Sequence, residues 1–233
     1  MARNVADLIN PPHVTKVDTY TPSPAEVARL VRMAANDPIG TLVAIAAYTG
    51  ARQGELLGLQ WPDVDLDKGT LSIRRTLLPP VPSGERFGPP KTARSRRTVT
   101  LPTVAVAALR AHRNRQHEQR LMLGPDYAAH DLVFATALGT PYLTRNVTRS
   151  FKRLLEQANL PASIRFHDLR HAAATNSLQA DVPLKVVSER LGHSTLAITA
   201  DLYTHRVASL EADAAERLPS LYHDATGKDT FPH

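Results

Sequence analysis

The stretch TGARQGELLGL, residues 49–59, follows a nearly all-apolar segment, 38–49, that we expect to form a buried helix ended by Gly50. Two glycines flank Arg52, and Glu55 stands three residues after it. Residues three apart share one face of a helix, so this spacing predicts that Arg52 and Glu55 pair and that the guanidinium points away from the core. A planar guanidinium fixed in this way can bind two phosphate oxygens at once. Taken alone, the same pattern fits an ordinary surface ion pair.

Outward from this stretch, the chain predicts an α+β, mainly α-helical domain with a small antiparallel sheet and no internal repeats. A capping box, Ser-Pro-Ala-Glu at 23–26, opens the first helix after a linker-like segment, 1–20. Alternating residues predict a β-hairpin at 64–76 with its turn at 67–69, and a strand returning at 98–101. Five prolines and two glycines between 79 and 90 predict a mobile loop. A short strand is expected at 132–134, a helical turn at 52–57, and helices at 102–123, 146–158, 168–179, 183–191, 195–203 and 208–218.

The composition narrows the class of protein. Lys and Arg outnumber Asp and Glu by 28 to 22, the isoelectric point is near 9.8, and 42% of the residues are hydrophobic, all of which fits a folded protein with a basic surface. The absence of cysteine excludes a disulfide framework, a thiolate zinc finger and a cysteine nucleophile. No apolar run approaches the ~18 residues that span a bilayer, and no signal-peptide pattern opens the chain, so we expect a cytoplasmic protein with no membrane partner.

Basic side chains gather in three places, in residues 86–97, 110–120 and 145–153. The first cluster holds five basic residues and no acidic one, whereas the segment 211–229 has five acidic residues against Arg217 and Lys228. Each cluster alone is more often a solvated face than a binding site. Three of them at this isoelectric point favour a nucleic-acid partner.

Three further stretches carry groups that bind phosphate or transfer protons. In HDLRH, 167–171, His167 and Arg170 share a helical face, so one phosphate could contact both side chains. The two histidines with Asp168 also approach the spacing of a zinc-protease motif. That alternative needs a third ligand and normally a Glu as the base, and Arg170 would repel a cation. In LGHS, 191–194, a glycine ends a helix and exposes His193 at a corner, where a histidine packed in a turn is the alternative. Tyr203 stands on a predicted helix, where packing is the ordinary role of a tyrosine.

Six boxes in this order resemble those of the tyrosine recombinases, the phage integrase family. The stretch 49–59 resembles the first-arginine box, and WPDVD, 61–65, the segment after it. PKT, 90–92, with RRTV, 96–99, resembles the hairpin that carries the family's lysine. The stretches 167–171 and 191–194 are similar to the His-x-x-Arg box and the box that follows it, and YTH, 203–205, to the nucleophile segment. One such box would be weak support, but six in order, covering roughly 21–205 with no departure at an essential position, are specific.

The resemblance implies the DNA breaking-and-rejoining fold and strand transesterification through a 3′-phosphotyrosyl intermediate, with no metal or other cofactor. It implies that Tyr203 is the nucleophile and that Lys91 protonates the departing 5′-oxygen. It assigns the phosphate clamp to Arg52 and Arg170, with a further hydrogen bond from His193. His167 would hold the phosphate or assist proton removal, and Glu55 would orient Arg52 or His167. Further contacts to DNA phosphates are expected from Arg94, Arg96, Arg97 and Arg113.

The resemblance also implies an organisation and partners. Residues 21–206 would form the catalytic domain, and residues 207–233 a C-terminal helix and tail that packs either on a neighbouring protomer or back on its own domain. The expected partners are double-stranded DNA attachment sites, three further copies in a tetramer on DNA, and an accessory DNA-bending or directionality factor. Family members usually carry a core-binding domain ahead of the catalytic one, so we expect either an excised catalytic domain or a short relative, from a phage or mobile element.

Two other functions remain open from the sequence. A type IB topoisomerase-like enzyme shares the nucleophile chemistry but relaxes one duplex and does not exchange strands between two. A DNA-binding module derived from an integrase would bind without cleaving, although such a module has no need of an intact nucleophile, lysine and arginine set.

Overall fold

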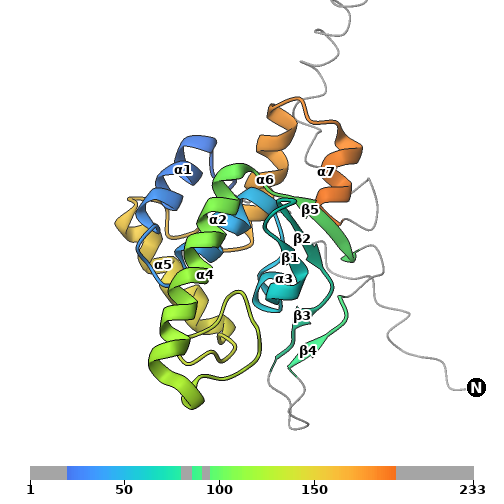
Figure 1. The fold of residues 1–233 in the computed structure, drawn as a ribbon. Helices are drawn as coiled ribbons and strands as arrows, with labels where there is room; N and C mark the ends of the chain where they lie inside the picture. The colour runs from blue at the N-terminus through green and yellow to red at the C-terminus, as the bar shows by residue number, and fades with distance from the viewer. Residues whose placement is uncertain (1–19, 80–85, 91–94, 193–233) are drawn as a thin grey trace, which may run out of the picture.

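The computed structural model describes residues 20–79, 86–90 and 95–192, and within them a helical body carries a small sheet along one side (Figure 1). The helices are α1 (Pro24–Met33), α2 (Gly40–Thr49), α3 (Gln53–Leu57), α4 (Thr103–Leu123), α5 (Thr144–Gln157), α6 (Asp168–Gln179) and α7 (Leu184–Leu191). Two short 3-10 turns, η2 (Trp61–Asp63) and η4 (Gly124–Asp126), join other elements. The α+β, mainly helical architecture expected from the sequence is confirmed.

The predicted capping box is present at the start of α1. The Ser23 hydroxyl accepts from the Glu26 backbone N–H, and the Glu26 carboxylate accepts from the Ser23 backbone N–H at 2.9 Å. Proline follows Ser23 at the first helical position, where its missing N–H costs no helical hydrogen bond. The helix therefore begins where its sequence indicates.

The sheet follows the predicted hairpin. Strands β1 (Val64–Asp65), β2 (Thr70–Ile73) and β5 (Arg97–Thr100) are antiparallel in the order β1-β2-β5, with Thr70 opposite Thr100 and Ile73 opposite Arg97. Alternate residues of β2 are buried, as the period of a strand packed on one face requires. The sheet thus turns one face, and with it the side chains at 97 and 99, toward the interior.

Two strand predictions need correction. The expected strand at 70–76 is interrupted, and its end becomes β3 (Thr76–Leu77), which pairs with β4 (Phe87–Gly88) inside the stretch expected to be a loop. Each of these strands has two residues, too few to show a period. The segment 132–134 is not a strand, because Leu132 makes only one isolated bridge. Two side chains of α4 hydrogen-bond to its carbonyls: Gln116 Nε2 lies 3.0 Å from the Leu132 carbonyl, and His112 Nε2 lies 2.7 Å from that of Val133. These bonds use the acceptors that a neighbouring strand would need.

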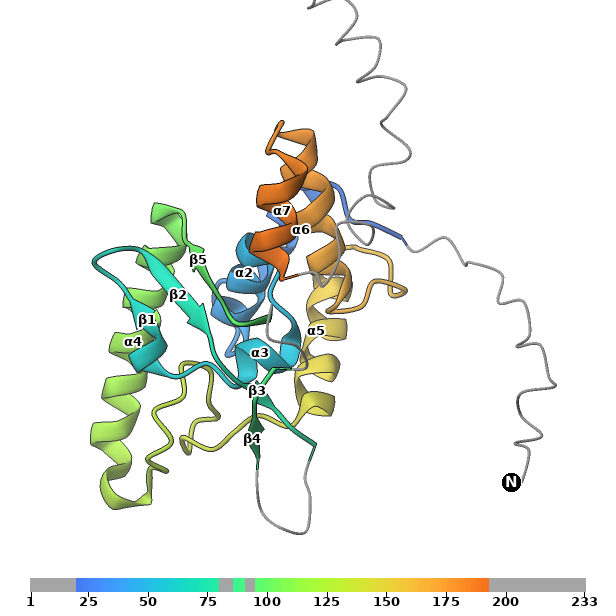
Figure 2. The same cartoon turned by 90° about the vertical axis from the view of Figure 1, so that its right-hand side faces the viewer.

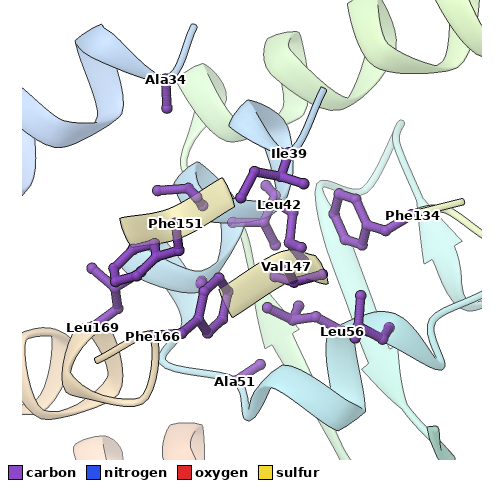
Figure 3. Close-up of a cluster of buried hydrophobic side chains, with 14 of the residues drawn as sticks. Ala34, Ile39, Leu42, Ala51, Leu56, Phe134, Val147, Phe151, Phe166 and Leu169 are labelled. Atoms are coloured by element: carbon purple, nitrogen blue, oxygen red, sulfur yellow. The ribbon is translucent and has the colours of Figure 1, made fainter. Parts of the chain in front are cut away.

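The core lies between α2, the sheet and α5. Helix α2 is buried almost all round, as its apolar sequence predicts. In Figure 3, Phe151 of α5 and Phe166, just before α6, lie side by side in the core, and their ring centroids are 5.3 Å apart in an edge-on arrangement. A second, smaller apolar cluster joins α6 to α7.

In the described parts of the chain, no helix combines the length and the apolar character needed to cross a membrane. The helices expected at 195–203 and 208–218 lie outside those parts.

Gly50 is where the two apolar clusters meet. It ends α2 in the left-handed conformation, with φ 62°, and its N–H bonds the Ala46 carbonyl at 2.9 Å. A Cβ at this position would lie 2.4 Å from Leu191 Cδ2 and 3.9 Å from Arg170 Cγ. The absence of a side chain at 50 therefore lets the end of α7 and the first turn of α6 close onto α2.

We predict that Gly50→Ala destabilises the protein more than Gly69→Ala does. Both glycines have φ +62°, so at either position alanine in the left-handed conformation should lower the free energy of unfolding by about 1–2 kcal/mol. At Gly69 the atom nearest to the new Cβ lies 3.4 Å away, which is an ordinary van der Waals contact. The clash with Leu191 should add about 1–3 kcal/mol to the Gly50 variant alone. Urea unfolding of both variants measures the difference, and equal losses would show that α7 is not packed against Gly50 as described.

Candidate functional site

The predicted site residues at 52, 55 and 170 come together at the ends of helices. Helices α6 and α7 each have one end that points toward the middle of the molecule, and these two ends face α3 (Figure 2). Arg52 caps the start of α3, and Arg170 lies in the first turn of α6. Gly192 ends α7, as predicted, and it does so in the left-handed conformation. Three segments far apart in the sequence thus deliver their ends to one place.

Arg170 is buried, with 4% of its surface exposed. Its Nη1 donates to the Gly50 carbonyl at 2.7 Å, while its Nη2 is buried with no hydrogen-bond partner among the residues that the structure describes. Burial, and after it repulsion by Arg52 and Arg97, lowers the pKa of Arg170 to about 9, against the opposing attraction of Glu55. A buried cation with an unused donor is an arrangement that an anion would complete.

Arg52 is held by the buried carboxylate of Glu55. Its Nη1 lies 2.8 Å from Glu55 Oε1 and its backbone N–H donates to Oε2 at 2.9 Å, so the pair predicted from the spacing is present. The Arg52 side chain is 41% exposed, whereas that of Glu55 is 3% exposed. The guanidinium is therefore anchored at one edge and open to solvent at another, as a phosphate-binding arginine needs to be.

A second arginine, Arg97, shares this carboxylate. Its Nη2 lies 2.9 Å from Glu55 Oε2, and its Nη1 donates to Oε1 at 3.3 Å. Burial, the largest influence, raises the pKa of Glu55, but hydrogen bonds and attraction from Arg97 and then Arg52 together keep it below its usual value. Glu55 is thus ionised at neutral pH.

The surroundings of Arg97 differ from those expected of a surface DNA contact. Its side chain is only 6% exposed, and all three of its guanidinium nitrogens donate to groups of the protein, whereas one nitrogen of Arg170 has no partner among the described residues. The strand period could have indicated this position, although the surrounding basic residues drew attention away from it. Arg97 and Val99 are two apart and so lie on the same face of β5, and Val99 is buried. Arg97 therefore belongs inside, with Glu55.

Two of the other expected DNA contacts lie among the described residues, and both are exposed. Arg96 is exposed beside β5, and Arg113 is exposed on α4, where its guanidinium lies 5.1 Å above the ring of Trp61. Arg94 lies outside the described residues, as do three expected catalytic residues: Lys91, His193 and Tyr203.

His167 stands at the N-terminal end of α6, and its ring is 5.1 Å from that of His171, nearly perpendicular to it. Burial is the main cause that lowers the pKa of both imidazoles, and for His167 the charges of His171 and Arg170 lower it further. Both rings are therefore held in the neutral form at neutral pH.

Asp168, the acidic residue of the zinc-site alternative, is paired with Arg165. Asp168 is buried and accepts from the Arg165 backbone N–H at 2.7 Å and from its Nη2 at 2.8 Å. Across residues 20–79, 86–90 and 95–192, no group of three or more His, Cys, Asp or Glu side chains is placed to hold a metal ion.

Comparison with known proteins gives consistent results. The model of the family described as phage integrase matches residues 23–209. The chain is 36% identical over 219 residues to a protein named tyrosine recombinase XerC-like from Caldanaerobacter subterraneus subsp. tengcongensis, covering 89% of this chain and 55% of that protein. It is 32% identical over 215 residues to an integrase of Streptomyces ambofaciens, covering 88% and 54% of the two chains. The chain thus spans about half the length of the curated relatives it matches.

Solved structures share the fold. The Tn1549 transposon integrase in complex with transposon right end DNA superposes with a TM-score of 0.74 at 21% identity, over 93% of this chain and 70% of that one. At this identity the likeness shows the fold alone.

We predict that Glu55→Gln lowers the free energy of unfolding at pH 7 by about 3 kcal/mol, because it leaves buried Arg97 without a counter-charge. The folded-state pKa of Glu55 is lowered, so its stabilisation is present above the unfolded pKa of about 4.3 and is lost as the pH falls through the lower folded value. The gap between wild type and variant should therefore narrow in acid. Denaturant unfolding from pH 7 to pH 3 measures it.

Glu26→Gln is the matched control, because Glu26 holds the same place in a capping box but is exposed. It should cost much less at pH 7. If both variants lose the same stability, the Glu55 carboxylate does not hold the arginine cluster together.

Proposed function

This chain belongs to the phage integrase family, and from that membership we propose that it is the catalytic part of a site-specific DNA recombinase, cleaving and rejoining DNA strands in the integration and excision of a phage or mobile element. The observation that supports this proposal most directly is the arginine cluster. Arg52, Arg97 and Arg170 place three positive charges against the carboxylate of Glu55, and one buried donor of Arg170 has no partner in the described part of the chain. A DNA phosphodiester supplies the missing anion.

In the proposed reaction, the Tyr203 oxygen attacks the phosphorus, the bond from phosphorus to the 5′-oxygen breaks, and that oxygen takes a proton from Lys91. The products are a 3′-phosphotyrosyl link and a free 5′-hydroxyl. The phenol of tyrosine has a pKa of about 10, so it leaves more readily than an alkyl alcohol, and a second 5′-hydroxyl can reverse the step. Strands are thereby rejoined without a nucleotide cofactor.

Arg52 and Arg170 would stabilise the charge that grows on the two non-bridging oxygens. Both are held before DNA arrives, one by Glu55 and the other by the Gly50 carbonyl, so little reorganisation is needed during the reaction. His193 would add a hydrogen bond. His167, kept neutral, would accept the proton of Tyr203 or hold the phosphate.

The proposed partners follow from the reaction. We infer double-stranded DNA attachment sites, a homotetramer on DNA, and an accessory DNA-bending or directionality factor, acting in the cytoplasm of the host cell. Residues 21–206 would be the catalytic domain, with 207–233 packing on a neighbouring protomer or on their own domain.

Covalent trapping tests the reaction. The protein is incubated with nicked duplexes of randomised core sequence, from which the cleaved segment is lost, and is then denatured in detergent. We expect a protein–DNA adduct whose peptide maps to Tyr203 and which Tyr203→Phe abolishes. Sequencing the trapped DNA gives the attachment site, and exchange between two such duplexes separates a recombinase from a topoisomerase-like enzyme. DNA binding without any adduct would contradict the proposal and favour a binding module.

Arg170→Met tests whether the buried positive charge of Arg170 serves to bind the DNA phosphate and not to stabilise the fold. Because the charge is desolvated and repelled in the DNA-free protein, its removal should raise the free energy of unfolding by about 1–3 kcal/mol while abolishing the adduct. Added sulfate should raise the Tm of wild type more than that of the variant. A variant destabilised by several kcal/mol would instead mean that Arg170 serves the fold through its bond to Gly50.

A further inference from the structure

Arg97 is a cross-link between three segments. From the start of β5, its Nε donates to the Arg190 carbonyl at 2.7 Å, its Nη1 to the Ser95 carbonyl at 3.0 Å, and both of its terminal nitrogens contact Glu55. The guanidinium therefore ties β5 to α3 on one side and to the last turn of α7 on the other. Such a set of bonds uses the planar fork of an arginine and cannot be reproduced by a lysine.

On the α3 side, Arg97 fixes the group that holds Arg52. Each oxygen of Glu55 is shared: Oε2 accepts from the Arg52 backbone N–H and from Arg97 Nη2, each at 2.9 Å, and Oε1 accepts from Nη1 of both arginines. Arg52 is partly exposed, whereas Arg97 is buried. The buried arginine thus sets the orientation of the carboxylate, and the carboxylate sets that of the exposed arginine.

On the α7 side, the bonds are reciprocal. Arg97 binds the carbonyl of Arg190, and the Arg190 side chain binds the carbonyls of Thr100, on β5, at 3.0 Å and of Tyr48, on α2, at 2.7 Å. A cation at the last carbonyls of a helix also has a favourable interaction with the helix dipole. The end of α7, from which the chain continues to His193, is therefore fixed to the strand and to the helix that lead to the arginine cluster.

We propose that Arg97 is a positioning residue for DNA cleavage: one buried guanidinium aligns Arg52 through Glu55 and holds the end of α7 that leads into His193. This inference rests on the recombinase function proposed above. It replaces a contact to DNA by a role inside the protein, and it makes strand cleavage depend on a side chain that does not touch the phosphate.

The test compares Arg97→Lys with wild type in single-turnover cleavage of the trapped nicked duplex at saturating protein. Lysine keeps the charge but can satisfy only part of the bond set. We expect the cleavage rate to fall about 10- to 100-fold while DNA affinity changes less than about threefold. Each variant is assayed at a temperature where its unfolding curve shows it folded.

Arg75→Lys is the matched control. Arg75 also pairs with a buried carboxylate, that of Asp63, which likewise closes the start of a short helix, but it lies outside the proposed site. It should lose stability in a similar way and keep the cleavage rate within about twofold. This comparison separates positioning from a general loosening of the fold.

The pH dependence supplies a readout that a purely structural role would leave unchanged. The charged groups that face Glu55 are Arg52 from the start of α3, Arg97 from β5 and Arg170 from α6. In Arg97→Gln, burial still raises the pKa of Glu55 while the opposing attraction of Arg97 is gone, so the acid side of the rate profile should move to higher pH. Arg97→Lys should move it less.

The outcomes are distinct. A wild-type adduct with a slow Arg97→Lys and a normal Arg75→Lys supports the inference. Wild-type rates in folded Arg97→Lys, or equal slowing in both lysine variants, overturn it while leaving the recombinase function intact. No adduct from wild type, with DNA bound, refutes the proposed function and this inference with it. If Arg97→Gln does not fold, the lysine variant decides.

Discussion

The buried carboxylate of Glu55 is the interaction on which the site depends. It closes the start of α3, pairs with Arg52 and Arg97, and supplies the negative charge that lets three guanidinium groups lie close together. Burying a carboxylate is costly unless hydrogen bonds and opposite charges compensate, and here both oxygens are fully engaged. The fold therefore keeps the arginines in place before any substrate binds. Within this cluster of described residues, three positive charges face one negative charge.

The same excess of positive charge bears on the stability of the domain. Arg170 is buried beside like charges, and one of its donors has no partner among the described residues. A group that weakens the free protein and strengthens a complex is typical of sites built for a charged transition state. The close approach at Gly50 serves the same end, because it brings the first turn of α6 against the end of α2 and lets the Gly50 carbonyl hold Arg170.

Local chemistry made much of the fold predictable. The capping box of α1, the apolar run of α2 and the hairpin turn at 67–69 each depend on neighbours in the sequence, and all three are present. The prediction failed where a segment is too short or too irregular to show a period. Phe87 joins a strand of two residues, and the segment 132–134 is kept out of a sheet by side chains of α4, neither of which leaves a periodic pattern.

For the site, the sequence by itself determined the residue types and one contact: Arg52 and Glu55 are three apart, so helical geometry alone pairs them. It also placed Arg170 on the first turn of a helix and a glycine at the end of α7. Only the tertiary structure decided that Arg97 turns inward to share Glu55, that Arg170 is buried against Gly50, and that α7 ends beside them. The physical reason is that burial and charge pairing depend on segments that are distant in the chain. The local sequence of a basic segment is the same whether its arginines face water or a buried carboxylate.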